Sequence, residues 1–281
     1  MKRNYINVNS DKWYKNITEN TEKFPFSFTY GNVNYNGFSK ENFELVDKTA
    51  VKENAKETTT FIFKKDDVLQ ITLICTHNFN FGETEWTVWF ENVGNKNSEV
   101  LFDVKSVIEF EGETPLLKGI LGDHINYYKP YCYDLKETVH FETNEPLPTH
   151  VVFPYFNLEY GNNGSMLAIG WAGNWSADFT SDGNKTTFVA RSTPNICTYL
   201  KPGEKVRTAL FVKADYTVRN EDYATNYWRE WFIKENLIRY TLRYFPKVWE
   251  MYRTFLLLVT VCDKIKGSAK ISCFLFYCPL E

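Results

Sequence analysis

The sequence predicts an all-β fold in which two antiparallel sheets pack face to face, followed by one amphipathic α-helix and an irregular C-terminal tail. Three observations support this prediction. Short apolar segments recur at steady intervals with turn-forming residues between them and no helical pattern, as in β-sandwiches. Aromatic residues, which favour strands, make up 17% of the chain. The 281 residues, of which 43% are hydrophobic, are enough for a large core.

The segment 100–110 (VLFDVKSVIEF) has the clearest strand pattern. Polar and apolar side chains alternate along most of it, which is typical of a strand with one buried face and one solvent face. Asp103, Lys105 and Glu109 are assigned to the solvent face. The buried face is expected to contain Val100, Phe102, Val104, Ile108 and Phe110.

Other strands are predicted from composition and turn signals. Residues 68–75 (VLQITLIC) and 86–93 (WTVWFENV) are apolar on both faces, as in the interior of a sandwich. Shorter strands are expected at 59–63, 138–142, 166–171, 186–191 and 206–212. Clusters of Gly, Asn, Asp and Pro predict turns at 92–97, 162–164, 181–184 and 201–204.

The pattern changes from strand to helix at Asn220, which is a favourable N-cap residue. Tyr223, Tyr227 and Trp231 recur at intervals of four residues, so they line one face of an amphipathic helix. After Leu237 no asparagine occurs and basic residues outnumber acidic ones, unlike the preceding part. We therefore expect a β domain at 1–219, a linker helix at 220–237 and an atypical tail at 238–281.

Charge and hydropathy argue against several classes of partner. The net charge of −3 and the pI of about 5.9 predict no binding of nucleic acid, which needs a basic surface. No segment reaches the ~18 apolar residues of a membrane helix, and the N-terminus lacks the apolar run of a secretion signal, so a cytoplasmic location is expected. The 6 cysteines and 4 histidines show no metal-ligand spacing, so free thiols and no metal or cofactor are expected.

The segment 122–133 (GDHINYYKPYCY) combines polar and aromatic side chains on what we expect to be a loop, because it contains Gly122 and Pro130. Binding sites are often carried by loops of this kind. The alternative is ordinary tyrosine packing along a long connection between strands. The candidate binding residues in this segment are Asp123, His124, Asn126 and Tyr128.

The segment 166–179 (MLAIGWAGNWSADF) carries two tryptophans on a glycine-rich turn. A sugar can stack its C–H face on an indole, and an asparagine amide can bind its hydroxyl groups, so Trp171, Asn174 and Trp175 are candidate carbohydrate-binding residues. Because the strand alternation ends at Gly170, we expect Trp171 to be mostly buried and Trp175 to be partly exposed. The alternative is that both rings only close the core.

Three motifs follow one another in an order that points to a known family. Gly170–Trp175 is an aromatic–small–Gly–Asn–aromatic turn, and 128–130 is a Tyr-basic-x-Pro loop with the proline one place early. Tyr227–Leu237 (YWREWFIKENL) is similar to a helix that usually ends in Asn-Leu-Pro, with Ile238 here in place of the proline. Over roughly residues 20–237, the chain resembles the N-terminal domain of α-galactosidase-like enzymes of glycoside hydrolase family 36.

The resemblance implies a galactose mutarotase-like β-supersandwich with a non-catalytic role. In this family the catalytic carboxylates lie in a (β/α)8 barrel of ~250 residues, which does not fit beside the sandwich in this chain, so no catalytic residue is assigned. Lys213-Ala214-Asp215 matches the family's Lys-x-Asp nucleophile motif, but it follows a sandwich strand, and we interpret it as a coincidence. The expected ligand is a galactoside or related carbohydrate. The expected protein partners are further copies of the chain or a missing catalytic domain.

Two other functions stay open beside this truncated, glycosidase-like module. A stand-alone, lectin-like carbohydrate-binding protein would present an exposed aromatic groove. A sugar-modifying enzyme of the mutarotase-like superfamily would need His124 or His150 to meet a glutamate in a cleft. No spacing in the sequence proposes such a pair.

Overall fold

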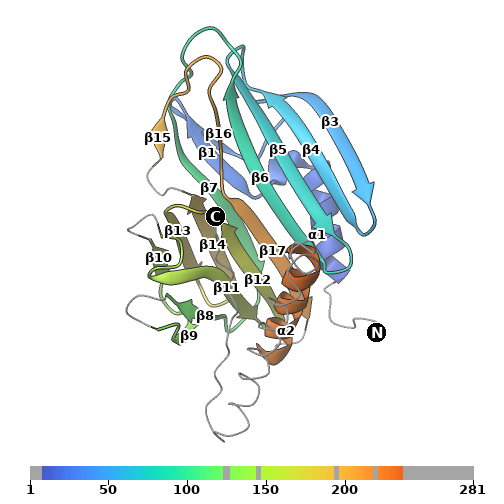
Figure 1. The fold of residues 1–281 in the computed structure, drawn as a ribbon, viewed down its shortest axis with the longest axis vertical. Helices are drawn as coiled ribbons and strands as arrows, with labels where there is room; N and C mark the ends of the chain where they lie inside the picture. Colours follow the sequence, from blue (N-terminus) through green and yellow to red (C-terminus); the bar gives the residue numbers. More distant parts are fainter. Residues whose placement is uncertain (1–7, 123–126, 144–146, 193–195, 218–220, 237–281) are drawn as a thin grey trace, which may run out of the picture. The chain divides into compact units, whose positions relative to one another are not determined.

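The computed structural model describes residues 8–122, 127–143, 147–192, 196–217 and 221–236. The chain divides into two compact units, Met1–Thr225 and Asn226–Glu281. The first unit contains two antiparallel β-sheets packed face to face, which confirms the predicted all-β sandwich (Figure 1). The predicted tail, 238–281, and the predicted N-cap, Asn220, lie outside the described residues.

The larger sheet contains ten strands. In their order across the sheet, nine of them are β3 (Glu44–Glu53), β4 (Lys56–Lys64), β5 (Leu69–Asn78), β6 (Glu83–Asn92), β17 (Leu210–Thr217), β12 (Asn163–Gly170), β11 (Val152–Tyr160), β8 (Leu116–Leu121) and β9 (Pro130–Asp134). The tenth strand, β16 (Lys205–Arg207), pairs with residues 89–91 of β6, and β17 pairs with residues 83–86 of the same strand.

The smaller sheet contains seven strands. Six of them follow the order β10 (Val139–Glu142), β13 (Trp175–Ser181), β14 (Lys185–Ser192), β7 (Leu101–Glu111), β1 (Phe26–Tyr30) and β2 (Val33–Asn36). The seventh strand, β15 (Cys197–Thr198), pairs with β7. The structure therefore has strands in the segments where the sequence predicts them, except that the single strand expected at 206–212 is divided between β16 and β17. It adds others, including β1, β2, β3 and β11.

Aromatic and aliphatic side chains fill the space between the two sheets. Phe28 of β1 lies 5.1 Å from Phe90 of β6, measured between ring centroids, and so joins the sheets at the centre. Along β5, alternate side chains from Leu69 to Cys75 are buried and those between them are half-buried. The prediction that this strand is buried on both faces is therefore wrong, because only one of its faces points toward the interior.

A β-bulge in β7 changes which side chains of that strand are buried. Asp103 has a φ of 49°, and the pairing with β1 shifts register here. One extra residue moves the alternation by one place, so Leu101 is buried and Phe102 is 37% exposed. The prediction that Phe102 faces the core is wrong for this reason. Val100, which precedes β7, is exposed and was also wrongly assigned to the core, whereas Val104, Ile108 and Phe110 are buried as expected.

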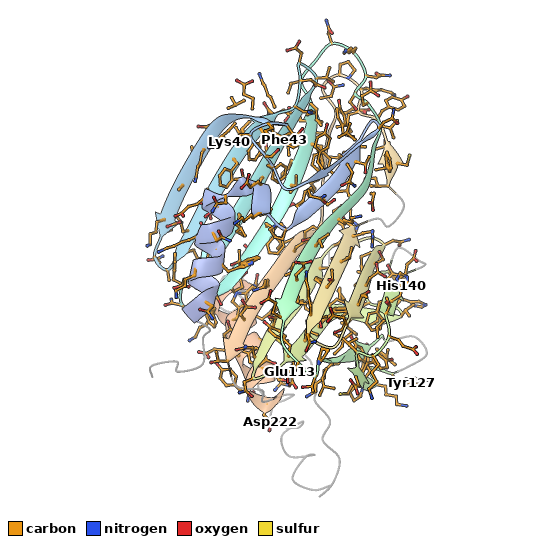
Figure 2. All side chains as sticks on the ribbon, turned by 180° about the vertical axis from the view of Figure 1, so that it is seen from behind. Lys40, Phe43, Glu113, Tyr127, His140 and Asp222 are labelled. Atoms are coloured by element: carbon orange, nitrogen blue, oxygen red, sulfur yellow. The ribbon has the colours of Figure 1, made fainter. Side chains whose placement is uncertain are left out.

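An N-terminal helix, α1 (Val8–Glu19), precedes the strands and was not predicted from the sequence. It lies on the side of the larger sheet that faces the interior, next to the smaller sheet (Figures 1 and 2). The ring of Trp13 is 6.0 Å from that of Trp86 on β6. Tyr14 and Ile17 are buried in the same core, so α1 covers a part of the larger sheet that the smaller sheet leaves free.

The segment 122–133, predicted to be a loop, is partly strand. Its end forms β9, which pairs with β8 from Ile120↔Pro130 to Leu116↔Asp134. The β8–β9 hairpin therefore places residues 127–129, which precede β9, at one edge of the larger sheet. The prediction of an uninterrupted loop is wrong because Pro130 opens an edge strand, a position that tolerates its missing N–H.

The other edge of the larger sheet is β3, in which every residue is exposed. Lys48 and Lys52 extend over the rings of Phe61 and Phe79, at 5.0 and 4.8 Å from the centroids. Inward-pointing lysines and the register shift near Leu45 are features that oppose pairing with another strand. We therefore regard β3 as a protected edge and not as a docking strand.

The predicted helix after the sandwich is confirmed as α2 (Glu221–Trp231), which continues as a π-helical turn, η2 (Phe232–Asn236). Its first residues belong to the first unit, where the ring of Tyr223 lies 6.1 Å from that of Tyr216 on β17. The domain boundaries expected at residues 219 and 237 stay predictions.

Candidate carbohydrate-contact surface

The turn between β12 and β13 carries the two candidate tryptophans, and their exposures are the reverse of those predicted. Trp175 is fully buried and Trp171 is only partly buried. Trp175 is the first residue of β13, where its side chain alternates inward with Ala177 and Phe179. The predicted outward release of the chain at Gly170 is wrong, because β13 pairs with β14 from Trp175 onward.

Two hydrogen bonds and one aromatic contact fix Trp175 in the core. Its backbone N–H donates to Oγ1 of Thr143 at 2.9 Å, and its indole N–H donates to the carbonyl of Pro148 at 2.8 Å. Its ring centroid lies 5.8 Å from that of Phe156 on the opposite sheet, in an edge-on contact. A side chain with no exposed surface cannot stack on a sugar, so Trp175 is removed from the candidate residues.

Trp171 is only partly buried and packs against the hydrophobic core of the sandwich. The guanidinium carbon of Arg207 is 5.3 Å from the centroid of its ring, within the range of a cation–π contact. A Cβ at position 173 would lie 3.0 Å from the Trp171 indole nitrogen, so a residue larger than glycine would crowd the indole. The turn therefore folds back so that the indole stays beside Arg207.

Arg207 and Trp89 stand directly opposite one another on β16 and β6. The guanidinium carbon of Arg207 is 6.0 Å from the Trp89 ring centroid. Two pairs further along, the ammonium group of Lys205 is 2.8 Å from a carboxylate oxygen of Glu91. We call Trp89, Trp171, Lys205 and Arg207 the indole–arginine cluster. Its three strand residues, Trp89, Lys205 and Arg207, lie on the face of the larger sheet that points away from the smaller one, because the alternate residue Phe90 is buried in the core.

Of the other predicted site residues, the structure describes Asn174 and Tyr128. Asn174 is half-buried, and its amide oxygen has no hydrogen-bond partner among the described residues. Tyr128 is 55% exposed, has a φ of 60° and contacts Phe153 with 5.7 Å between ring centroids. Asp123, His124 and Asn126 lie outside the described residues.

A second group of polar side chains, which the sequence did not reveal, crosses the outer face of the smaller sheet. Nδ1 of His140 is 2.6 Å from Asp178, and Nε2 is 3.4 Å from Glu142. Asp178 also accepts a hydrogen bond from Arg191 at 2.8 Å, and Arg191 approaches Asp103 at 3.7 Å. The hydrogen bond to Asp178 raises the pKa of His140. We call these five residues the charge ladder; Figure 2 labels His140 on it.

A third polar group surrounds the buried His77 beneath α1. His77 is fully buried, donates from Nε2 to Asp11 at 2.9 Å and accepts at Nδ1 from Thr84 at 2.8 Å. The ring of Tyr14 stacks on it at 4.6 Å and 10°. Burial lowers the pKa of His77, although the hydrogen bond to Asp11 opposes this effect.

The Lys213-Ala214-Asp215 motif belongs to the same sealed region. Lys213 and Asp215 are 6% and 5% exposed and form an ion pair. The hydroxyl of Ser165 donates to Asp215 at 2.5 Å, and the ammonium group of Lys213 lies 4.4 Å from the ring centroid of Trp13. This carboxylate points into the sandwich and is not presented to solvent.

Two classes of site are not found among the described residues. No group of three or more His, Cys, Asp or Glu side chains there is arranged to hold a metal ion. The helices of this part of the chain are too short and too polar to meet the requirement for crossing a membrane.

Structural comparison relates the fold to α-galactosidases of glycoside hydrolase family 36. The α-galactosidase AgaA from Geobacillus stearothermophilus, in complex with 1-deoxygalactonojirimycin, superposes with a TM-score of 0.57 at 15% identity over 73% of this chain and 32% of that chain. The α-galactosidase from Lactobacillus brevis gives a TM-score of 0.57 at 11% identity over 74% of this chain and 31% of that one. No protein-family model and no curated protein matches the sequence.

These comparisons show a shared fold, and the matched extent is consistent with the N-terminal domain that the sequence motifs indicated. The chain spans about a third of the length of the enzymes it matches. Another form of AgaA in the same comparison is a complex with stachyose, at a TM-score of 0.55 and 14% identity over 75% of this chain and 32% of that chain.

Proposed function

We propose that the chain is a non-catalytic β-supersandwich domain, or a truncated form, of an α-galactosidase-like glycoside hydrolase, and that it contacts carbohydrate through the Trp171 turn. The fold shared with family 36 enzymes supports the first part. The partly exposed indole of Trp171, with the exposed guanidinium of Arg207 beside it, supports the second. An indole and a fan of N–H donors are groups suited to a sugar's C–H face and hydroxyls.

A non-catalytic role agrees with where the carboxylates lie. Glycoside hydrolysis generally needs two carboxyl groups on either side of the scissile bond, ~5–10 Å apart. Asp215 is sealed in the interior, and the carboxylates of the charge ladder lie along one face of a sheet, bound to His140 and Arg191. The proposal includes assembly with a catalytic domain or further copies of the chain, and a cytoplasmic location.

Binding to raffinose, measured by isothermal titration calorimetry, tests the carbohydrate contact. We expect weak binding, because a lone domain supplies one wall of a site. Trp171→Ala should weaken it by about tenfold, equivalent to about 1.4 kcal/mol. The control is Tyr199→Ala, which removes another exposed aromatic ring (46% exposed) and should leave the affinity unchanged. Equal affinities for the wild type and Trp171→Ala would contradict the proposed contact.

The catalytic part of the proposal has its own test. The isolated chain is expected not to hydrolyse a chromogenic α-galactoside. Turnover that disappears when a carboxylate of this chain, such as Asp215, is replaced by its amide in a folded variant would overturn the non-catalytic assignment.

A lectin-like protein acting alone is the second function that the Trp171 surface would suit. It would bind raffinose with full affinity without any other domain, whereas a glycosidase module should bind more tightly once a catalytic barrel is supplied in trans. Titration with and without a family 36 barrel distinguishes the two.

A further inference from the structure

The guanidinium group of Arg207 contacts two aromatic rings. Its guanidinium carbon lies 5.3 Å from the centroid of Trp171 and 6.0 Å from that of Trp89. The side chain is exposed, and its position opposite Trp89 is fixed by the pairing of β16 with β6. Contact with two rings restricts the rotamers of a long side chain, so less entropy is lost when it binds a ligand.

The charge of Arg207 is not neutralised within the described part of the chain. Among those residues, no carboxylate forms an ion pair or hydrogen bond with its guanidinium. Its neighbour Lys205 is paired with Glu91 at 2.8 Å, and Arg191 is paired with Asp178 at 2.8 Å. Arg207 therefore differs from both in keeping its N–H donors available to solvent.

A guanidinium with free N–H groups binds a planar carboxylate or a phosphate through two parallel hydrogen bonds. The contacts with the two rings use none of the guanidinium N–H groups as hydrogen-bond donors to an acid, so these donors stay available for such a contact. Lys205, two residues away on the same face, is neutralised by Glu91, so Arg207 carries the unpaired positive charge of the cluster. These features favour an anionic group over a neutral hydroxyl.

We propose that the indole–arginine cluster binds the acid group of an anionic saccharide, with Arg207 as the ligand-binding residue and the sugar ring against the rim of Trp171. The inference rests on the proposed carbohydrate contact and deepens it by naming the ligand class. Carboxylated and phosphorylated sugars share the required chemistry.

The test compares galacturonic acid and galactose 6-phosphate with neutral galactose by titration calorimetry at pH 7 and low salt. At least one acid sugar should bind at least about tenfold more tightly than galactose. This preference should weaken as salt is raised, since the contact is exposed. Arg207→Gln should abolish the preference, and Arg207→Lys, which keeps the charge without the planar fork, should retain only part of it. Arg191→Gln is the matched control and should keep it.

Each outcome decides the inference. Equal affinity for galactose and both acids, unchanged by Arg207→Gln, overturns it while the proposed galactoside contact stands. Acid binding that depends on Arg207, with no binding of galactose or raffinose, supports the inference and overturns the galactoside part of the proposed function. Inorganic phosphate binding as tightly as galactose 6-phosphate, together with no binding of galacturonic acid, would show a bare anion site and overturn the saccharide assignment.

Discussion

The interior beneath α1 and the outer face of the smaller sheet contain the same kinds of polar group in opposite environments. In both, a histidine is bonded to an aspartate, His77 to Asp11 at 2.9 Å and His140 to Asp178 at 2.6 Å. Burial lowers the pKa of His77, whereas the hydrogen bond to Asp178 raises the pKa of the half-exposed His140. The same pairing is thus accompanied by opposite pKa shifts, because desolvation is the largest contribution at His77 only.

The two regions also differ in how much stability is lost when one partner of an ion pair is removed. A buried pair that loses one partner leaves an uncompensated charge in a poorly solvated place. An exposed pair that loses one partner is rescued by water and by its neighbours. Substitutions in the buried Lys213–Asp215 pair are therefore expected to lower the free energy of unfolding strongly, and substitutions in the charge ladder weakly.

The largest effect is expected from breaking the sealed pair. Asp215→Ala should lower the free energy of unfolding by about 3–5 kcal/mol, because Lys213 stays buried without its partner. Arg191→Ala in the charge ladder should cost at most about 1 kcal/mol. Urea unfolding of both variants measures the difference. Similar losses in the two variants would show that burial does not separate these regions.

The two tryptophans extend the comparison to apolar side chains. Trp175→Ala should cost about 3–5 kcal/mol, as expected for a large, fully buried ring. Trp171→Ala should cost clearly less, because its ring is partly exposed and packs on Arg207. Thermal unfolding provides the measurement. An equal cost for both would mean that the Trp171 turn is as much a part of the core as β13.

His77 should make the protein less stable as the pH falls. Its folded-state pKa lies below the unfolded value of about 6.5, so the unfolded chain binds a proton more readily. Well above pH 6.5 His77 is neutral in both states and causes no loss of stability. The free energy of unfolding decreases as the pH falls from about 6.5 toward the lowered folded-state pKa. His77→Gln should lose less stability than the wild type between pH 7.5 and 5.5 in urea unfolding. An unchanged acid dependence would contradict the burial argument.

His140 should act in the opposite direction and more weakly, since water screens its partners. Its folded-state pKa is raised, so its contribution is complete below about pH 6.5 and is lost as the pH rises through the folded-state pKa. His140→Gln should remove a small loss of stability between pH 6 and 8. If His140→Gln steepened that loss, the assigned sign would be wrong.

Sequence patterns predicted the sheets well where alternation was regular. The strand within 100–110 and the helix α2 were found because their periodicities extend over most of each segment. The bulge at Asp103 was not predictable, because it depends on pairing with β1. The helix α1 was missed although Trp13, Tyr14 and Ile17 fall on one helical face, since twelve residues give a weak local signal beside a β-rich chain.

The candidate site was only partly predictable. Trp171 was identified from its turn, but its exposure and that of Trp175 were reversed, because the start of β13 is set by pairing with β14. Arg207 was missed altogether. It meets Trp89 and Trp171 only when three segments that are far apart in sequence assemble on one face of the sheet.

The central claim is that carbohydrate contacts the exposed end of this turn and not its buried end. The most direct measurement is a titration of the indole N–H resonances with raffinose in two-dimensional NMR, with Trp171 and Trp175 assigned from Trp→Phe variants. The Trp171 resonance should shift progressively with raffinose concentration while that of Trp175 stays fixed. A shift of Trp175 alone, or no shift of either resonance at saturating raffinose, would contradict the claim.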